Sequence, residues 1–294
     1  MPWQIPVVLR IITAHVAHPI IQKKLAGLPS RTRRLRAMFL MCLVLSAGYA
    51  AVSPSPFVLD RWFILICAIG VANSFAAYAS WRAVDMSLSK TALFTFMDDV
   101  IPITLGIVLL GENKIITPAL GLGVVLCVGA VIVNTVMDSR EKPAEEGKTG
   151  WRIFLWIGIY SVIWGVAHFL FRVFALNGVS LPTFLVGWYG GAFLGSFAVL
   201  HLMGEKEAGP TLTRRGIAGV AILTTTAFSS LALAYWANQN APLAVTQPIF
   251  QVSEMILPTL IGLLYFKEAK HLDGKRKLLF AVAFIGSLVV ALNY

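Results

Sequence analysis

The chain has 294 residues, of which 57% are hydrophobic and only 13% are charged. An ordinary soluble domain carries about 25% charged residues, so this composition argues against a soluble globular protein and favours a multi-span membrane protein with short loops. The formal net charge of +10 would suit a nucleic-acid partner. The basic residues, however, lie in short loops between apolar runs, which is the membrane pattern, and we expect no nucleic acid as a partner.

Ten apolar runs are long enough to cross a bilayer, because about 20 mostly apolar residues span its hydrocarbon core. The sequence therefore predicts an all-α membrane protein with ten transmembrane helices. A polar linker at 139–150 divides the chain into two sets of five helices, at 1–138 and 151–294. The predicted helices cover residues 3–22, 37–53, 61–81, 89–110, 116–137, 151–174, 181–203, 215–237, 243–266 and 276–293.

The basic residues also predict an orientation. Lys and Arg are concentrated in the loops that follow the first, third, fifth, seventh and ninth predicted helices. Positively charged loops stay in the cytoplasm as a rule, so these loops are expected to be cytoplasmic and both chain ends to lie outside. The N-terminal sequence has no basic stretch followed by a cleavage site, and we expect no signal peptide. The expected location is the cell inner (plasma) membrane, multi-pass, with the lipid bilayer as a partner.

Two segments of the chain match each other without a gap, at 89–112 and 245–268. A second match, at a different spacing, joins Val16-Ala17-His18 to Val166-Ala167-His168. Since five is an odd number of helices, a second copy that follows the first must be inverted in the membrane. Inverted repeats are typical of secondary transporters that bind substrate near the bilayer midplane. The first match pairs Asp98 with Glu254, Pro102 with Pro258, Gly106 with Gly262, and Glu112 with Glu268.

The paired acids and prolines predict a polar site at two helix kinks. An Asp in the middle of a bilayer costs about 3 kcal/mol, so it is seldom there without a role. A proline nitrogen cannot bond the carbonyl four residues earlier, so Pro102 frees the carbonyl of Asp98 and Pro258 frees that of Glu254. We interpret Asp98 and Glu254 as ligands of a substrate cation or a coupling proton, and the two prolines as hinges. The alternative is that both acids pair with other helices and hold the bundle together.

Other polar and aromatic residues of the apolar runs are candidates for the same substrate or proton site. Histidine titrates near neutral pH, but a membrane histidine is often a hydrogen-bonded core residue, and a Trp is often an interfacial anchor. A structural role is expected for Glu112 and Glu268 at helix ends. Gly187, Gly191 and Gly195 predict close packing of a neighbouring helix, within this chain or in a second copy as a homodimer. The remaining site candidates are His18, His168, Gln247, Gln251, Asn73, Tyr78, Trp81 and Trp164.

Several short motifs resemble the drug/metabolite transporter (DMT) superfamily, specifically its ten-helix EamA-type transporters. These motifs are Leu109-Leu110-Gly111-Glu112 followed by a Gly-rich run, Trp164-Gly165, and Arg36 before the second helix. The resemblance covers nearly the whole chain and implies two inverted five-helix EamA-like repeats and a small polar or amphipathic metabolite or drug as substrate. The chain departs from the family pattern in its first predicted helix, which has no Trp-Gly pair and no acid. The coupling acid of the small four-helix relatives therefore has no counterpart here.

These features lead to one functional expectation, a secondary active transporter (exporter or exchanger) that works by alternating access, with proton coupling as one option. The alternatives are an uncoupled facilitator of the same fold and a non-transporting membrane partner subunit. An enzyme is not expected, because the chain contains no HExxH, GxSxG or phosphate-loop motif. Cys42, Cys67 and Cys127 lie singly in apolar runs without metal-ligand spacing, so no metal, disulfide or cofactor is expected.

Overall fold

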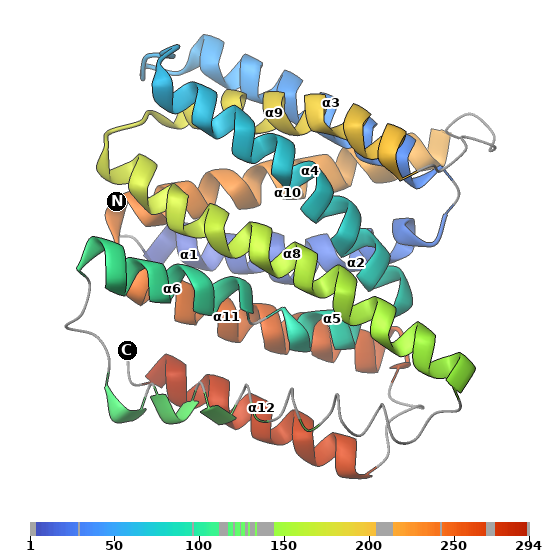
Figure 1. The fold of residues 1–294 in the computed structure, drawn as a ribbon. Coiled ribbons are helices and arrows are strands. Elements are labelled where there is room, and N and C mark those ends of the chain that lie inside the picture. The colour runs from blue at the N-terminus through green and yellow to red at the C-terminus, as the bar shows by residue number, and fades with distance from the viewer. Residues whose placement is uncertain are drawn as a thin grey trace. The chain divides into compact units, whose positions relative to one another are not determined.

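The computed structural model describes residues 4–28, 30–95, 97–111, 117–119, 121–123, 125–126, 129, 133, 144–203, 214–241, 243–268 and 274–292 (Figure 1). Within these ranges the regular elements are all helices. Most of the predicted helix at 116–137, the first part of the predicted linker and Glu112 lie outside the described residues, as does the side chain of Gln251.

The helices follow the predicted apolar runs, with a π-helix labelled η where one occurs. The first three elements follow one another without a break, and α8 begins inside the stretch predicted as a linker. In chain order the elements are α1 (Gln4–Arg10), η1 (Ile11–Ala17), α2 (His18–Ala26), α3 (Arg31–Val52), α4 (Arg61–Met86), α5 (Leu88–Phe94), α6 (Met97–Leu110), α8 (Ala144–Leu176), α9 (Leu181–Leu202), α10 (Arg214–Asn240), α11 (Leu243–Leu260), η3 (Ile261–Tyr265) and α12 (Gly274–Leu292).

Among the described residues, six helical stretches are long and apolar enough to cross a bilayer, by length and composition. Large apolar side chains also stand on the molecular surface: Val44, Val52 and Ile64 expose 63%, 81% and 70% of their area. Soluble proteins seldom expose contiguous apolar surface of this kind. The fold is thus that of an all-α membrane protein, as predicted. The six stretches are Gln4–Ala26, Arg31–Val52, Arg61–Met86, Trp151–Leu176, Leu181–Leu202 and Gly216–Asn240.

The first span carries its polar residues on a buried face, and a π-helix in its middle makes this possible. In a π-helix each N–H bonds the carbonyl five residues earlier, so residues five apart lie on one face. Arg10 and His15 are five apart across η1 and are both buried. Pro19 and Gln22 continue this buried face at ordinary α spacing. The π segment therefore turns these polar groups inward, away from the apolar exterior.

The predicted helix at 89–110 is two helices, so the expectation of one continuous helix is corrected. α5 ends at Phe94, Thr95 forms a turn, and α6 begins at Met97. The carbonyl of Thr95 accepts a hydrogen bond from the backbone N–H of Asp98, only three residues on, at 2.9 Å. The same carbonyl accepts the hydroxyl of Ser161 on α8 at 3.5 Å. A bond over three residues tightens the chain at the point where a continuous helix would bond over four.

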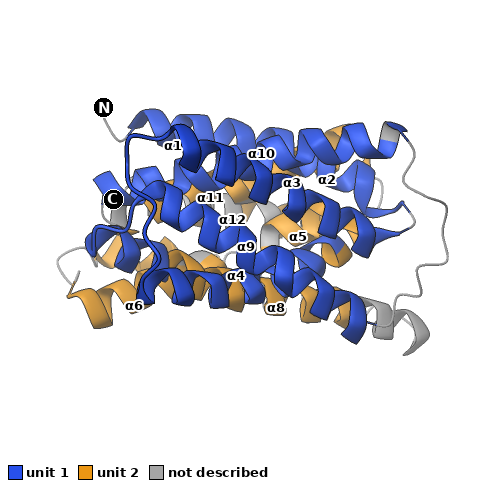
Figure 2. Cartoon of the chain, turned by 90° about the horizontal axis from the view of Figure 1, so that it is seen from above, with its two compact units in different colours: residues 1–81, 170–241 blue, residues 82–169, 242–294 orange. Residues whose placement is uncertain are grey.

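The chain forms two compact units, shown in different colours in Figure 2. Unit 1 comprises residues 1–81 and 170–241, and unit 2 comprises residues 82–169 and 242–294. Each unit combines segments from both of the halves predicted at 1–138 and 151–294. The compact units are thus not the predicted halves, and the inverted repeat, which concerns matching sequences, stays a prediction.

Unit 1 contains the glycine face predicted on the seventh helix. α3 packs on α9 and α10, and the first span packs on α10. A Cβ atom added at Gly191 of α9 would meet the carbonyl of Cys67 on α4, and one at Gly195 would meet the backbone of Val71. Gly70 of α4 approaches the α9 backbone in the same way. The glycine face therefore packs against a helix of the same chain.

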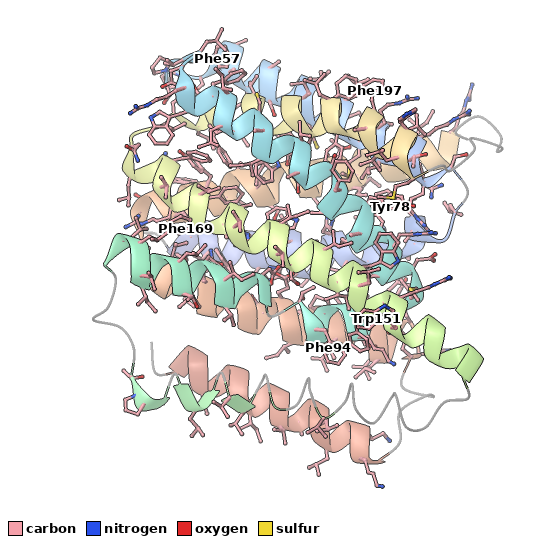
Figure 3. The ribbon with its side chains drawn as sticks, viewed as in Figure 1. Phe57, Tyr78, Phe94, Trp151, Phe169 and Phe197 are labelled. Atoms are coloured by element: carbon pink, nitrogen blue, oxygen red, sulfur yellow. The ribbon has the colours of Figure 1, made fainter. Side chains whose placement is uncertain are left out.

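Unit 2 is built around α11, which packs on α5, α6 and α12. α5 also contacts α8 through aromatic rings: the centroids of Phe94 and Phe154 are 4.9 Å apart in an edge-to-face arrangement (Phe94 is labelled in Figure 3). Ile153 and Ile157 of α8 complete a buried apolar cluster with Phe94. This cluster fixes α8 beside α5, close to the break between α5 and α6.

Glu268 ties the end of the ninth predicted helix to the start of α5. Its carboxylate accepts hydrogen bonds from the backbone N–H groups of Leu88 (3.1 Å) and Ser89 (3.0 Å). The hydroxyls of Ser87 (3.0 Å) and Ser89 also donate to it. A Cβ atom at Gly262 would lie 2.9 Å from the nitrogen of Ser89, so only glycine allows this approach. The contacts agree with the structural role expected for Glu268.

Candidate functional site

The two predicted acids lie in the same unit, and the elements that carry them both contact the middle of α8. On the α6 side, the hydroxyl of Ser161 reaches the carbonyl of Thr95, and Gly165 lies so close to Ile101 that a Cβ atom would stand 2.7 Å from its side chain. Asp98 lies three residues before Ile101 in α6, and residues three apart are neighbours on a helix surface, so we expect Asp98 to lie near the contact with α8. Its side chain is 1% exposed.

Asp98 lies in the first turn of α6, where an acidic side chain costs less than in the middle of a helix. The first N–H groups of an α-helix are unpaired within the helix, and the helix dipole is positive at this end. A carboxylate here is therefore better stabilised than one in the middle of a continuous helix. The sequence predicted Asp98 in the middle of an unbroken helix. Because α6 begins at Met97, the free-energy cost of burying this acid is lower than in that prediction.

On the α11 side, Glu254 meets Tyr160 of α8. The Tyr160 hydroxyl donates to Oε1 of Glu254 at 3.5 Å, and the Glu254 side chain is part-buried. The chain directions follow from other contacts of unit 2. Glu268, which follows α11 and η3, contacts the start of α5, so α11 runs antiparallel to α5 and α6. Ser161 contacts Thr95 and Gly165 contacts Ile101, so α8 runs parallel to α5 and α6. α11 and α8 therefore run in opposite directions past each other.

Gln247 lies on the same face of α11 as Glu254, two helical turns earlier. Seven residues of α-helix rise about 10 Å, and in antiparallel helices this places Gln247 near the level of His168 on α8. Gln247 is 0% exposed, and neither its amide oxygen nor its amide nitrogen has a hydrogen-bond partner among the described residues. A buried polar group without a partner costs about 1–3 kcal/mol, so this amide is suited to a bound molecule.

Aromatic side chains of α8 connect the levels of Glu254 and Gln247. The ring centroids of Tyr160 and Trp164 are 6.2 Å apart, and those of Trp164 and His168 are 5.1 Å apart. The spacing of four residues places these rings above one another on one face of α8. His168 is buried, with 2% of its surface exposed. Unit 2 thus holds Asp98, Glu254, Gln247, Trp164 and His168 of the predicted residues.

Of the other predicted site residues, Gln251 belongs to unit 2 by its position in the chain, and the rest lie in unit 1. Nδ1 of His18, on α2, is 3.2 Å from Oγ1 of Thr226, on α10. Asn73, Tyr78 and Trp81 lie on α4 and are buried, at 4%, 1% and 2% exposure; Tyr78 is labelled in Figure 3. Oδ1 of Asn73 has no hydrogen-bond partner within the described part of the chain, and the guanidinium of Arg34 lies 5.9 Å from the ring centre of Trp81.

The two predicted hinges lie inside helices. Pro102 is in the interior of α6, seven residues after the turn at Thr95, and Pro258 is in α11, just before the π-helix η3. Sequence reasoning missed the break at Thr95 and the contact of Glu254 with Tyr160. The signal for the break was the pair of acids after Met97, since acidic residues are enriched in the first turn of a helix. For Tyr160 the sequence offered only its spacing of four residues from Trp164, which indicates a shared helix face but not the contact with Glu254.

Comparisons with known proteins show the fold alone. No family model matches the chain, and no curated protein matches it. Twenty-two chains of solved structures match. One of them, described as "Crystal structure of protein", is 15% identical, with a TM-score of 0.65 over 99% of this chain and 97% of its own. In the described residues, no group of three or more His, Cys, Asp or Glu side chains could hold a metal ion.

Proposed function

We propose that the protein is a secondary active transporter, an exporter or exchanger, of a small polar or amphipathic metabolite or drug. One observation carries this proposal: Gln247 is fully buried among apolar helices with no partner for its amide in the described residues, on the face of α11 that holds Glu254. A protein that only held its helices together would satisfy such a group internally. A molecule that enters and leaves would satisfy it only when bound.

The broken helix beside the acid supports transport by alternating access. Discontinuous helices near the bilayer midplane form substrate and ion sites in many secondary transporters, because their ends offer unpaired backbone groups and helix dipoles. Asp98 lies at such an end, and Pro102 and Pro258 are candidate hinges on the helices that carry the acids. In this proposal Asp98 and Glu254 bind a cationic group or a coupling proton, and His168 or His18 relays a proton.

The architecture we propose is two inverted five-helix repeats of the EamA type, in the cell inner membrane. The supporting observations are the sequence match of 89–112 with 245–268 and the packing of α6 against α11, the helices that carry the matched acids. In addition, each compact unit draws on both halves of the chain. An inverted repeat with interleaved halves would give such a division.

The test is transport by the purified protein in liposomes, with solutes chosen by a thermal-shift screen. A solute that stabilises the protein should accumulate when a pH gradient is applied. Glu254→Gln and Asp98→Asn should each lower uptake by at least about tenfold, which corresponds to about 1.4 kcal/mol. Unchanged, still pH-sensitive uptake by the double variant would contradict the assigned role of both acids, and no uptake of any stabilising solute would contradict transport.

Two alternatives make different predictions. An uncoupled facilitator would equilibrate the same solute but would not accumulate it when only a pH gradient is present. A non-transporting subunit would bind its partner through the glycine face of α9, but that face packs on α4 of the same chain. The observation that favoured a partner subunit is therefore accounted for inside the chain.

A further inference from the structure

We propose that the site in unit 2 selects an amine that carries N–H bonds on its charged nitrogen and a second, uncharged polar group a few carbons away. This inference rests on the proposed transport function and names its substrate class. It follows from three features: the charge of the site, the balance of hydrogen-bond acceptors and rings, and the separate position of Gln247.

Along α8 between Tyr160 and His168, the three helices that form the site supply acids and no cation. The helices that carry Asp98 and Glu254 both contact α8 here, and residues 157–171, 97–110 and 243–266 contain no Lys or Arg. The cations that border this stretch lie one turn beyond it at each end: Arg82, whose guanidinium lies 5.7 Å from the ring centre of Trp156, and Arg172, which donates to the carbonyl of Asn238. In a low-dielectric surrounding such a site favours a cation and disfavours an anion.

The acceptors favour a nitrogen that donates hydrogen bonds. The carboxylates of Asp98 and Glu254 accept hydrogen bonds and donate none when charged. A quaternary ammonium has no N–H, and proteins bind it mainly in cages of several aromatic faces. Here the rings form a single column on α8, in which Trp164 stands between Tyr160 and His168. One Trp face can support a cation, but the carboxylates are matched only by a primary or secondary ammonium.

Gln247 predicts the second polar group. Its amide has both a donor and an acceptor, is 0% exposed, and has no hydrogen-bond partner among the described residues. It lies two turns of α11 from Glu254, about 10 Å along the helix axis, and both side chains extend toward the solute from that axis. A solute that pairs its ammonium with Glu254 therefore reaches Gln247 with a hydroxyl, amide or carbonyl on a short carbon chain.

The experiment compares five matched probes on purified protein by thermal shift and by quenching of tryptophan fluorescence. The probes are 5-amino-1-pentanol, its N,N,N-trimethyl derivative, n-pentylamine, 1,5-pentanediol and 5-hydroxypentanoate. We expect 5-amino-1-pentanol to bind at least about tenfold more tightly than the trimethylated amine, the diol and the hydroxy acid. Glu254→Gln should weaken both primary amines by about tenfold or more.

Gln247→Met separates the two contacts. It should weaken 5-amino-1-pentanol but leave n-pentylamine unchanged, and the control Gln239→Met, at an exposed position near the end of α10, should change neither. Equal binding of the trimethylated amine, preference for the hydroxy acid, binding of none of the five, or equal effects of Gln247→Met on both amines would overturn the proposal. Liposome uptake of an anionic or neutral solute with no uptake of amines would refute the amine class while leaving transport intact. Absence of all uptake would refute transport itself.

Discussion

Removing the carboxylate of Glu268 should release the start of α5 from the end of the α11 segment. The carboxylate accepts from two backbone N–H groups, those of Leu88 and Ser89, and from two serine hydroxyls. The hydroxyls can rotate toward other acceptors, whereas the N–H groups of a helix start have fixed directions. The two backbone bonds therefore determine most of the loss.

The structure gives a magnitude for this loss. A hydrogen bond to a charged group contributes about 1.5–3 kcal/mol, and the lower value applies to a carboxylate that is only part-buried. Glu268→Ala should therefore cost about 3 kcal/mol through its two backbone bonds. Glu268→Gln keeps one acceptor oxygen and should cost about half of that. For chains of this size 1 kcal/mol corresponds to a shift of about 2 °C in Tm, so the expected decreases are about 6 °C for Ala and about 3 °C for Gln.

The assay is thermal unfolding of the purified protein in detergent, together with amide hydrogen exchange of α5. The control is Asp85→Asn, which removes an exposed negative charge at the end of α4 and should change Tm by less than about 1 °C. In Glu268→Ala the amides of residues 88–91 should exchange faster while those of α9 stay protected. A Tm within 1 °C of the unaltered protein, with unchanged exchange in α5, would refute the role given to this carboxylate.

Two further predictions concern unit 1. Gly191→Ala places a Cβ atom against the Cys67 carbonyl and should lower the free energy of unfolding by about 1–3 kcal/mol. In the control Gly190→Ala the new Cβ atom would lie 3.8 Å from Leu43, so this variant should be neutral or slightly stabilising. Equal Tm values for the two variants would contradict the close helix contact. Arg34→Lys should cost about 2 kcal/mol, because Nη2 of the buried Arg34 guanidinium donates to the carbonyls of both Leu25 and Leu28, and an ammonium does not reproduce that planar geometry. The comparison variant is Arg36→Lys, at a half-buried position where the guanidinium contacts the ring of Phe197, and it should cost under about 1 kcal/mol in the same unfolding assay.

The positions of the spans could be predicted from the sequence because hydropathy is a sum over many residues. The predicted ranges 61–81, 151–174 and 181–203 correspond to α4, the apolar part of α8, and α9, with end points that differ by a few residues. The π-helix in the first span could not be predicted in this way. It depends on which residues must share a buried face, and only packing against α10 and the rest of unit 1 decides that.

The placement of the candidate residues could be predicted in part, whereas their role stays a prediction. The pairing of Asp98 with Glu254 by sequence matching selected two residues on helices that both contact α8. Gln247 and Glu254 are seven residues apart, and this spacing places them on one face of a helix, although the sequence analysis did not draw that conclusion. Tyr160 was missed, because a tyrosine in an apolar run has many ordinary reasons to be there. Its contact with Glu254 depends on the antiparallel passage of α8 and α11, which no local pattern contains.

The segment at 89–110 was predicted as one helix with acids in its middle, and the structure divides it into α5 and α6. Proline was the expected cause of irregularity, yet the chain turns seven residues before Pro102. At this turn the carbonyl of Thr95 accepts the N–H of Asp98 and, at 3.5 Å, the hydroxyl of Ser161. A new helix, α6, begins after this turn, and its first turn contains Asp98. The helix dipole at that end is favourable for an acidic side chain, an effect that a hydropathy scale does not include. The acid and the break therefore support each other, and replacing Ser161 would change both.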